Sequence, residues 1–293
     1  MSVKKKKLLI LGAEGMLGHV CLLKLSDKYL VYATTKQKKN FINKKIKIPT
    51  NIKIIDKIDL TNFNLLDKIV KKIRPSYVVN CAGIINKKIK NYSKLNSIIV
   101  NSLLPHKLSN LSDKYKFRFI HVSTDCVFDG KTGNYYEHDK KNASDFYGQT
   151  KSIGEEFSSK NSVIIRTSII GHEIKSKLGL LEWFLKSKVK VYGFDNFKYS
   201  GLTTLELQKY ILFFLNHKTL NGVYNISSNP ISKYQLLKII KKVYTKKIDI
   251  LKNSTIKKNM VLKSSKLENK NVKSQNWQKQ INDLREFYEK NYK

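Results

Sequence analysis

Residues 8–18 read Leu-Leu-Ile-Leu-Gly-Ala-Glu-Gly-Met-Leu-Gly, a short apolar run that leads straight into three spaced glycines. Such a run is typical of a buried parallel strand, and a helix is expected over residues 16–25. Glycines at this point let the backbone turn tightly, approach a pyrophosphate and pack the helix against the strand. The stretch therefore predicts a dinucleotide-binding turn in an α/β fold. Its expected cofactor contacts are Gly12, Gly15, Met16, Leu17 and Gly18.

Apolar runs and helical patterns then alternate along the chain. Further strands are expected at residues 30–34, 57–60, 77–83, 117–122 and 163–167. Thr61 is expected to cap a helix that ends before Pro75, and a helix over 101–115 holds Pro105 in its first turn. This alternation predicts a Rossmann-type doubly wound sheet of five or six parallel strands.

The alternation loosens after Arg166. Helices are expected at residues 178–188, 203–215, 232–243 and 277–288, and a strand at 223–226. Thr203 with Glu206 and Ser232 with Gln235 have capping-box spacing, whereas residues 252–273 are charged, aperiodic and expected to form a surface segment. We predict an NADP-binding Rossmann domain over residues 1–168, with a return at about 201–226, and a smaller mixed substrate-binding part formed by 169–200 and 227–293.

The end of the second strand predicts the cofactor. A carboxylate there would hold the ribose 2′-hydroxyl of NAD, whereas a 2′-phosphate requires cations. Residues 35–39 contain three lysines and no carboxylate, so we predict NADP, with NADPH preferred over NADH. Further cofactor contacts are expected from Thr35, Lys36, Asp59, Leu60, Cys81, Ala82 and Gly83.

The reactive groups are predicted further along. Tyr147 and Lys151 are four residues apart, which places both side chains on one face of a helix. A positive charge beside a phenol lowers the pKa of the phenol and fits it for proton transfer. Thr124 follows a buried strand, at the edge where open α/β sheets bind ligands, and its hydroxyl is expected to join this catalytic set.

Composition sets outer limits on function. The chain has 57 Lys and Arg against 22 Asp and Glu, a formal net charge of +35. Arginine occurs only at positions 74, 118, 166 and 285 and the lysines are scattered, which argues against a specific nucleic-acid reader. Three cysteines without metal-ligand spacing predict no metal site and a reduced intracellular protein. With no apolar run long enough to span a bilayer, we predict a cytoplasmic protein.

These residues together resemble the extended short-chain dehydrogenase/reductases, and within them the dTDP-4-dehydrorhamnose reductase group. The resemblance covers nearly the whole chain. It rests on the glycine turn, Asp59-Leu60-Thr61, Asn80-Cys81-Ala82-Gly83, the run from Ile120 to Gly130, Tyr147-Gly148-Gln149-Thr150-Lys151, Ser264-Ser265-Lys266-Leu267 and Trp277.

The resemblance implies reduction of the 4-keto group of a nucleotide-linked 6-deoxy sugar by NADPH or NADH. Tyr147 would protonate the keto oxygen, Lys151 would bind the nicotinamide ribose and tune the tyrosine, and Thr124 would hold the carbonyl. Ser123, Asp125 and Arg166 are expected at the substrate, and Glu137 matches an acidic position of the group. A homodimer is left open.

The chain departs from this group at two positions. Cys126 stands where the group usually has tyrosine, and the segment around Ile169 lacks the aromatic residue that packs on the sugar. The sugar or its nucleotide is therefore expected to differ, with Trp183 as either a replacement contact or a core residue. Two other functions remain open: a sugar-nucleotide epimerase or dehydratase that retains NAD, and a non-catalytic regulatory subunit that binds a dinucleotide.

Overall fold

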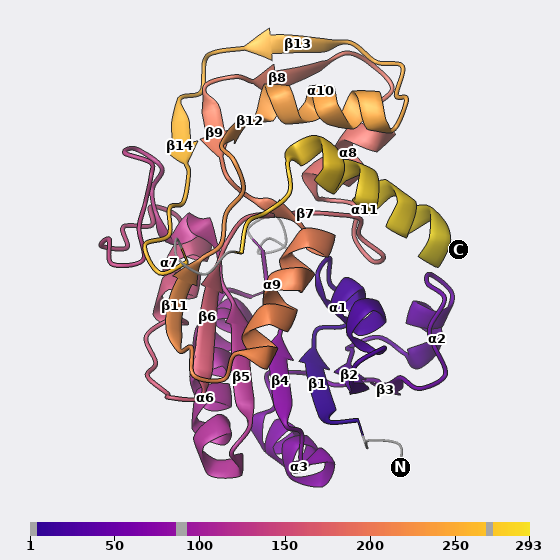
Figure 1. The fold of residues 1–293 in the computed structure, drawn as a ribbon, viewed down its shortest axis with the longest axis vertical. Coiled ribbons are helices and arrows are strands. Elements are labelled where there is room, and N and C mark those ends of the chain that lie inside the picture. The colour runs from indigo at the N-terminus through magenta and orange to yellow at the C-terminus, as the bar shows by residue number, and fades with distance from the viewer. Residues whose placement is uncertain (1–4, 86–92, 268–271) are drawn as a thin grey trace.

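The computed structural model describes residues 5–85, 93–267 and 272–293. Its centre is a seven-stranded sheet in the order β11-β6-β5-β4-β1-β2-β3, and every neighbouring pair of strands is parallel (Figure 1). The strands are β1 (Lys7–Leu11), β2 (Leu30–Thr34), β3 (Lys53–Ile55), β4 (Tyr77–Asn80), β5 (Arg118–Val122), β6 (Ser162–Arg166) and β11 (Gly222–Asn225). The predicted Rossmann-type doubly wound fold is confirmed.

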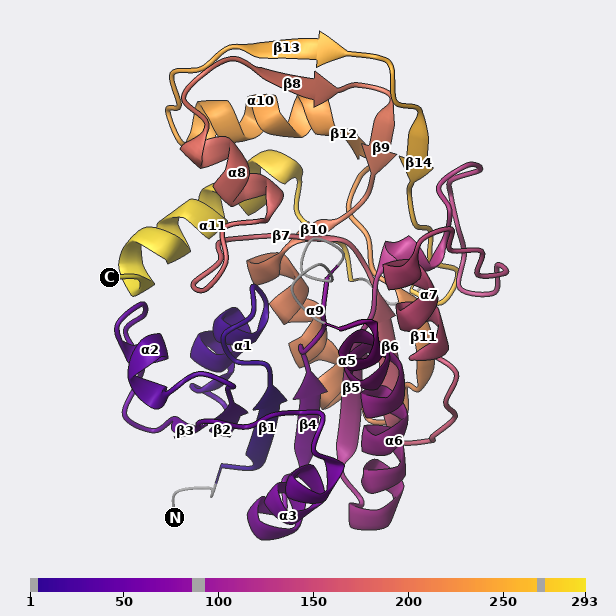
Figure 2. The ribbon, with the colours of Figure 1, turned by 180° about the vertical axis from the view of Figure 1, so that it is seen from behind.

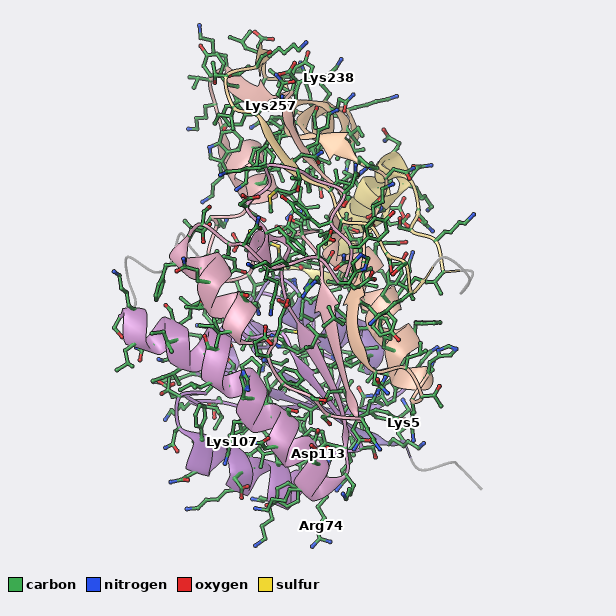
Figure 3. The ribbon with its side chains drawn as sticks, turned by 90° about the vertical axis from the view of Figure 1, so that its left-hand side faces the viewer. Lys5, Arg74, Lys107, Asp113, Lys238 and Lys257 are labelled. Carbon is green, nitrogen blue, oxygen red and sulfur yellow. The ribbon has the colours of Figure 1, made fainter. Side chains whose placement is uncertain are left out.

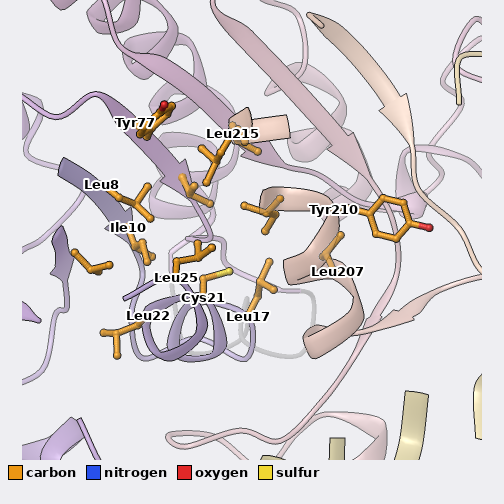
Figure 4. Packing of buried hydrophobic residues seen from close by; sticks show 14 of the residues in the cluster. Leu8, Ile10, Leu17, Cys21, Leu22, Leu25, Tyr77, Leu207, Tyr210 and Leu215 are labelled. Atoms are coloured by element: carbon orange, nitrogen blue, oxygen red, sulfur yellow. The ribbon is translucent and has the colours of Figure 1, made fainter. Parts of the chain in front are cut away.

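Helices cover both faces of this sheet. Helices α1 (Gly18–Leu25) and α9 (Thr204–Asn216) lie on one face, while α3 (Phe63–Ile73) and α6 (Leu104–Tyr115) lie on the other (Figure 2). Strand β1 shows why: Leu8 and Ile10 pack with the α1 and α9 side, and Leu9 and Leu11 with the α3 and α6 side. Figure 4 shows the first of these clusters, in which Cys21 of α1 faces the sheet.

The strand order reverses between β1 and β4, because the chain crosses from β3 back to the other side of β1. Such a reversal opens a crevice at the carboxyl ends of the strands, where this class of sheet binds ligands. Leu11, Thr34 and Asn80 are in register as the last residues of β1, β2 and β4. The loops that follow them therefore meet at one place.

The second part of the chain stands above these carboxyl ends (Figure 1). It has its own apolar cluster, which includes Leu181, Phe184, Leu236, Ile240 and Ile281. Its strands are β7 (Ile169–Ile170), β8 (Val191–Phe194), β9 (Phe197–Tyr199), β10 (Leu202–Thr203), β12 (Ile231–Ser232), β13 (Ile250–Asn253) and β14 (Lys258–Met260). Its helices are α8 (Leu180–Lys186), α10 (Lys233–Val243) and α11 (Trp277–Asn291). Assignment of the two parts to cofactor and substrate stays a prediction.

Three short helices complete the described elements: α2 (Lys39–Asn43), α5 (Lys94–Ile98) and α7 (Phe146–Ile153). Between α5 and α6 the backbone forms a π-helical turn, Ile99–Leu103. Pro105 lies at the start of α6, as predicted, where its missing N–H costs nothing. The capping box of Ser232 and Gln235 is also confirmed.

Several local predictions are wrong. The third strand was expected at residues 57–60 but lies at Lys53–Ile55, because Lys57 has a φ of 57° and turns the backbone out of the strand. Asn62, not Thr61, caps α3 by accepting a hydrogen bond from the backbone N–H of Leu65. Thr203 caps α9, but the Glu206 carboxylate bonds Lys209 and the Gln275 backbone instead of closing a capping box.

The expected surface segment 252–273 is also wrong over its described residues. It contains the end of β13 and all of β14, and Met260, Val261 and Leu262 are buried. Parallel pairing with β8 and β9, and not local periodicity, orders this stretch. Residues 268–271 lie outside the described residues.

The lysines are spread over the molecule. Lys238 and Lys257 point outward at one end, and Lys5 and Lys107 lie at the other (Figure 3). None of the helices within residues 5–85, 93–267 and 272–293 combines the length and apolar character needed to cross a bilayer.

Candidate active site

A cleft opens at the carboxyl ends of β1, β2 and β4. Its walls include most of the predicted cofactor contacts: Gly12, Gly15, Thr35, Lys36, Asp59, Leu60, Cys81, Ala82 and Gly83. Sequence reasoning missed other residues of the walls, among them Glu14, Ile84, Asn96, Val100 and Lys175. The predicted contacts Met16, Leu17 and Gly18 do not line this cleft.

The glycine turn explains that difference. Gly12 has a φ of +80°, and a Cβ there would lie 3.0 Å from the backbone of Ala82, so only glycine lets the turn pass β4. A Cβ on Gly18 would lie 2.1 Å from the Gly12 carbonyl oxygen. Gly18 therefore lets α1 pack against the turn, and Leu17 is buried beneath it. Leu17 and Gly18 therefore shape the turn and do not line the cleft.

Four charged side chains gather at the end of β2: Glu14, Lys36, Asp59 and Lys175, which we call the charged corner. The Lys36 ammonium lies 2.8 Å from the Asp59 carboxylate, and this hydrogen bond holds the pKa of Asp59 well below its usual value. Lys175 Nζ lies 3.8 Å from Glu14 Oε1. All four line the cleft, so the corner can meet a ligand there.

The Thr124 hydroxyl lies at the carboxyl end of β5. It accepts a hydrogen bond from the Cys126 backbone N–H at 3.1 Å and donates to Asp125 Oδ1 at 3.2 Å. These bonds fix the short 3₁₀ turn Asp125–Val127 and hold the hydroxyl beside the sheet edge. Thr124 is thus positioned by its own turn.

Tyr147 is brought to Thr124 by helix α7. Asp145 caps this helix by accepting a bond from the Gly148 N–H at 2.8 Å. A Cβ on Gly148 would lie 2.1 Å from the Cys126 carbonyl oxygen, so glycine next to the tyrosine allows the helix to touch the Thr124 turn. The Thr124 hydroxyl lies near enough to the Tyr147 phenol to act on the pKa of the phenol, which it lowers. The structure therefore brings these two predicted residues together.

Lys151 is held by groups at the end of β5. Its buried ammonium donates to the Val122 carbonyl at 2.9 Å and lies 3.3 Å from His121 Nε2. Burial lowers the pKa of Lys151 to about 8. Burial also raises the pKa of Tyr147 above its ordinary value, and the neighbouring charges of Cys126 and Asp125 act in the same direction. The effect of Lys151 on the pKa of the phenol stays a prediction.

A buried polar chain supports Lys151. His121 Nδ1 lies 3.2 Å from the Asn80 amide nitrogen, and Asn80 Oδ1 accepts a bond from the Ala82 N–H at 3.1 Å. This chain joins the lysine to the wall of the cleft, since Ala82 lines it. Neither His121 nor Asn80 was predicted as a site residue. Asn80 ends β4 and pairs with His121, the last residue but one of β5, and this place near the ligand edge is the signal that could have found them.

The predicted substrate residues fall into two groups. Asp125 is buried close to Thr124, and desolvation raises its pKa to about 6, opposed by the charges of Lys258 and Lys233. Ser123 is also buried there, and its hydroxyl has no hydrogen-bond partner among the described residues. Both are sequence neighbours of Thr124, and their contact with a substrate stays a prediction.

Arg166 has a different environment. Its guanidinium forms a buried, bidentate pair with Glu155, at 2.9 Å from Nε and 2.8 Å from Nη2 to Oε2, and Nη1 donates to the Glu137 carbonyl at 3.1 Å. Both charged groups are nearly fully buried. These contacts do not support the predicted role in substrate binding, because the donors already have partners inside the protein.

Glu137 is structural as well. Its carboxylate accepts bonds from the backbone N–H groups of Asn225 and Ser265, at 3.0 Å and 3.1 Å. It thereby ties the segment Ser264-Ser265-Lys266-Leu267 to β11. Among the described residues no group of three or more His, Cys, Asp and Glu side chains is placed to hold a metal ion.

The sequence matches one protein family almost end to end. The family described as the RmlD substrate binding domain matches residues 6–289. The chain belongs to the RmlD family. The resemblance predicted from the motifs is thus confirmed, since members of this family and its relatives include dTDP-4-dehydrorhamnose reductases.

Two curated relatives show how low the sequence identity to this chain is. The chain is 25% identical over 236 residues to the spore coat polysaccharide biosynthesis protein SpsK of Bacillus subtilis, covering 78% of this chain and 75% of the relative. It is 29% identical over 168 residues to dTDP-4-dehydrorhamnose reductase of Aggregatibacter actinomycetemcomitans, covering 55% of this chain and 51% of that enzyme. The second alignment therefore spans about half of each protein.

Solved structures share the fold over nearly the whole chain. One is a dTDP-4-dehydrorhamnose reductase from Bacillus anthracis in complex with NADP, with a TM-score of 0.80 at 20% identity, covering 97% of this chain and 99% of the other. A hypothetical dTDP-4-dehydrorhamnose reductase from Sulfolobus tokodaii has a TM-score of 0.76 at 25% identity, covering 92% and 95%. The RmlD family fold thus extends through both parts of the molecule.

The two departures predicted from the motifs can be placed. Cys126 lies next to the reactive groups: its thiol is 3.6 Å from Asp125 Oδ1, and burial raises its pKa to about 12. Trp183 is 41% exposed on α8, so a role in the core is excluded. Ile169 begins β7, which pairs with β10.

Proposed function

We propose that this chain uses NADPH to reduce the 4-keto group of a nucleotide-linked 6-deoxy sugar, in nucleotide-sugar and surface polysaccharide biosynthesis. The observation that carries the proposal is the packing of α7, which holds Tyr147, against the Thr124 turn, at the same end of the sheet as the cleft. The names of RmlD-family relatives support the same substrate class, since one is a dTDP-4-keto-6-deoxy-D-glucose reductase from Streptomyces niveus.

The residues of the cleft fit a dinucleotide. Gly12 and Gly15 leave backbone exposed at the end of β1, where a side chain would fill the space next to Ala82 and Cys81. Lys36 and Lys175 supply cations for phosphate groups, and Asp59 and Thr35 supply hydrogen-bond acceptors for ribose. When bound, the dinucleotide supplies the hydride that reduces the carbonyl carbon.

Tyr147 is the proton donor in this proposal. Because its pKa is raised, the phenol keeps its proton at neutral pH and can deliver it to the developing alkoxide of the sugar. Thr124 holds the carbonyl oxygen by turning its hydroxyl proton from Asp125 Oδ1 to the sugar. Lys151, with a pKa of about 8, stays largely protonated at pH 7 and contributes positive charge beneath the reacting groups.

Lys233 and Lys258 would meet the diphosphate of the sugar nucleotide. Both act electrostatically on the buried Asp125, and both ammonium groups lie over the ring of Phe197, at 3.7 Å and 6.0 Å from its centroid. Lys233 belongs to α10 and Lys258 to β14, so both come from the second part of the chain, whereas Thr124 and Tyr147 come from the first. A nucleotide diphosphate needs cations at such a position.

The test is a panel of nucleotide-linked 4-keto-6-deoxy sugars added with NADPH to the purified protein. We expect NADPH absorbance to fall only when a suitable ketosugar is present, and NMR to identify the reduced product. Turnover without added reductant, by protein that carries bound NAD, would contradict the proposal and favour an epimerase or dehydratase. Dinucleotide binding without turnover across the panel would favour a regulatory subunit.

A further inference from the structure

Glu14 is an unusual residue for the turn that it occupies. It lies between two glycines of the turn, and its Oε1 accepts a bond from the Lys36 backbone N–H at 3.3 Å. Its Oε2 is buried and has no hydrogen-bond partner among the described residues. A carboxylate at the end of the second strand is the group that binds a ribose 2′-hydroxyl and repels a 2′-phosphate. Sequence reasoning looked for that carboxylate only in residues 35–39 and found none.

Lys175 faces this carboxylate from the second part of the chain. It lies in the connection between β7 and α8, and this connection reaches the amino end of α1 in both Figure 1 and Figure 2. Contact is direct: a Cβ on Gly179 would lie 2.8 Å from Met16 Cε. The Lys175 ammonium is 3.8 Å from Glu14 Oε1 and lines the same cleft.

The connection that carries Lys175 is well anchored. Glu173 Oε2 accepts bonds from the backbone N–H groups of Leu178 and Gly179, each at 2.7 Å, and Ser176 donates to the other oxygen at 2.8 Å. Ile174, next to Lys175, is buried in the core cluster on the α1 side of the sheet. The lysine is therefore presented to the charged corner by a fixed turn.

We propose that Lys175 determines which dinucleotide the cleft accepts, by neutralising Glu14. The inference rests on the proposed function and extends it. With both lysines present, the two carboxylates and two ammonium groups of the charged corner balance, and a 2′-phosphate gains Lys175 and Lys36 as partners. Without Lys175, Glu14 faces the ribose uncompensated. The corner then repels the 2′-phosphate of NADPH and accepts the 2′-hydroxyl of NADH.

The experiment measures binding instead of turnover. Dissociation constants are determined by fluorescence titration for NADPH and NADH, and by calorimetry for the fragments 2′,5′-ADP and 5′-ADP, at one ionic strength. In the Lys175→Met variant we expect affinity for NADPH and 2′,5′-ADP to fall about fivefold, the upper end of the scale of one partly exposed ion pair. Affinity for NADH and 5′-ADP should stay within about twofold of the wild type.

Two further variants make the test specific. Lys177→Met removes the same charge from the same connection, at a residue that does not line the cleft, and should leave all four constants unchanged. In Glu14→Gln/Lys175→Met the repulsive carboxylate is also gone, so affinity for 2′-phosphate ligands should recover in part.

Equal loss of all four ligands in Lys175→Met, or no recovery in the double variant, would overturn the assignment of Lys175 while leaving the proposed reductase intact. If the wild-type protein binds none of the four, the proposed function itself fails, and the inference fails with it.

Discussion

The Lys151 ammonium lies 3.3 Å from Nε2 of His121, with both groups buried beneath the sheet edge. The imidazole cannot share the positive charge, because burial and the adjacent lysine hold the pKa of His121 well below its usual value. Lys151 is therefore the titrating group of the pair near neutral pH.

This pair predicts an alkaline limit to activity. As pH rises through about 8, Lys151 loses its proton and its positive charge, so kcat/KM for NADPH should fall. The measurement is the pH dependence of kcat/KM in the wild type and in Lys151→Arg. An arginine stays charged throughout this range. In the variant, although it is slower, kcat/KM should therefore not fall as pH rises through about 8. If kcat/KM falls at the same pH in both proteins, a group other than Lys151 causes the fall.

Removal of the Tyr147 hydroxyl should impair the chemical step. Tyr147→Phe keeps the ring but removes the proton donor, and we expect kcat to fall by roughly 10²–10⁴. The dissociation constant for NADPH should not change. Tyr192→Phe is the matched control, because this tyrosine is exposed on β8. Wild-type turnover in Tyr147→Phe would reject its role as the proton donor.

The pair of Arg166 and Glu155 should contribute to stability more than to substrate binding. Loss of one partner leaves the other charge buried and unpaired, so Arg166→Met is expected to lower the free energy of unfolding by about 3–5 kcal/mol. Urea denaturation measures this change, and Arg166→Met/Glu155→Met should regain part of it. Lys279→Met, which breaks an exposed pair with Asp283, should have little effect. A raised KM for the sugar nucleotide at unchanged stability would instead restore the predicted substrate contact.

His19 should make stability depend on pH. It is fully buried in α1, with Nδ1 at 2.6 Å from the Gly15 carbonyl and Nε2 against the Tyr292 hydroxyl, and burial lowers its pKa to about 4. The unfolded chain, with a His pKa near 6.5, binds the proton first as pH falls. The contribution of His19 should therefore lower stability by roughly 3 kcal/mol between about pH 6.5 and pH 4, and should change no further below that range.

The measurement is urea denaturation at several pH values. His19→Gln should flatten the decline relative to the wild type, whereas His217→Gln, at an exposed histidine, should not. An unchanged slope in His19→Gln would show that other groups cause the decline.

Much of the fold follows from local pattern. The bounds of β2 agree with the sequence to the residue, and those of β5 and β6 within one residue, because buried parallel strands carry nearly continuous apolar runs. Strand β3 and the stretch after residue 252 were misplaced because a left-handed turn at Lys57 and pairing with distant strands decide them. Neither cause is visible in a short window of sequence.

The candidate site divides in the same way. Thr124, Tyr147 and the glycine turn come from motifs in which neighbours in sequence are neighbours in space. Lys175 lines the same cleft as Gly15 although more than 150 residues separate them in the sequence. His121 of β5 contacts Lys151 of α7. The fixed spacing of Tyr147 and Lys151 predicted a shared helix, but tertiary hydrogen bonds decided where the ammonium group lies.

The edge strand β11 has a practical consequence for anyone who would express this protein in pieces. It is contributed by residues 222–225, after the chain has already passed through residues 169–200 of the second part, and it pairs with β6 along its whole length. A fragment that stops at residue 168 would make β6 an unpaired edge strand. It would also lack α9, which covers apolar side chains on one face of the sheet. Such a fragment should aggregate, and only co-expression with the remaining segment would rescue it.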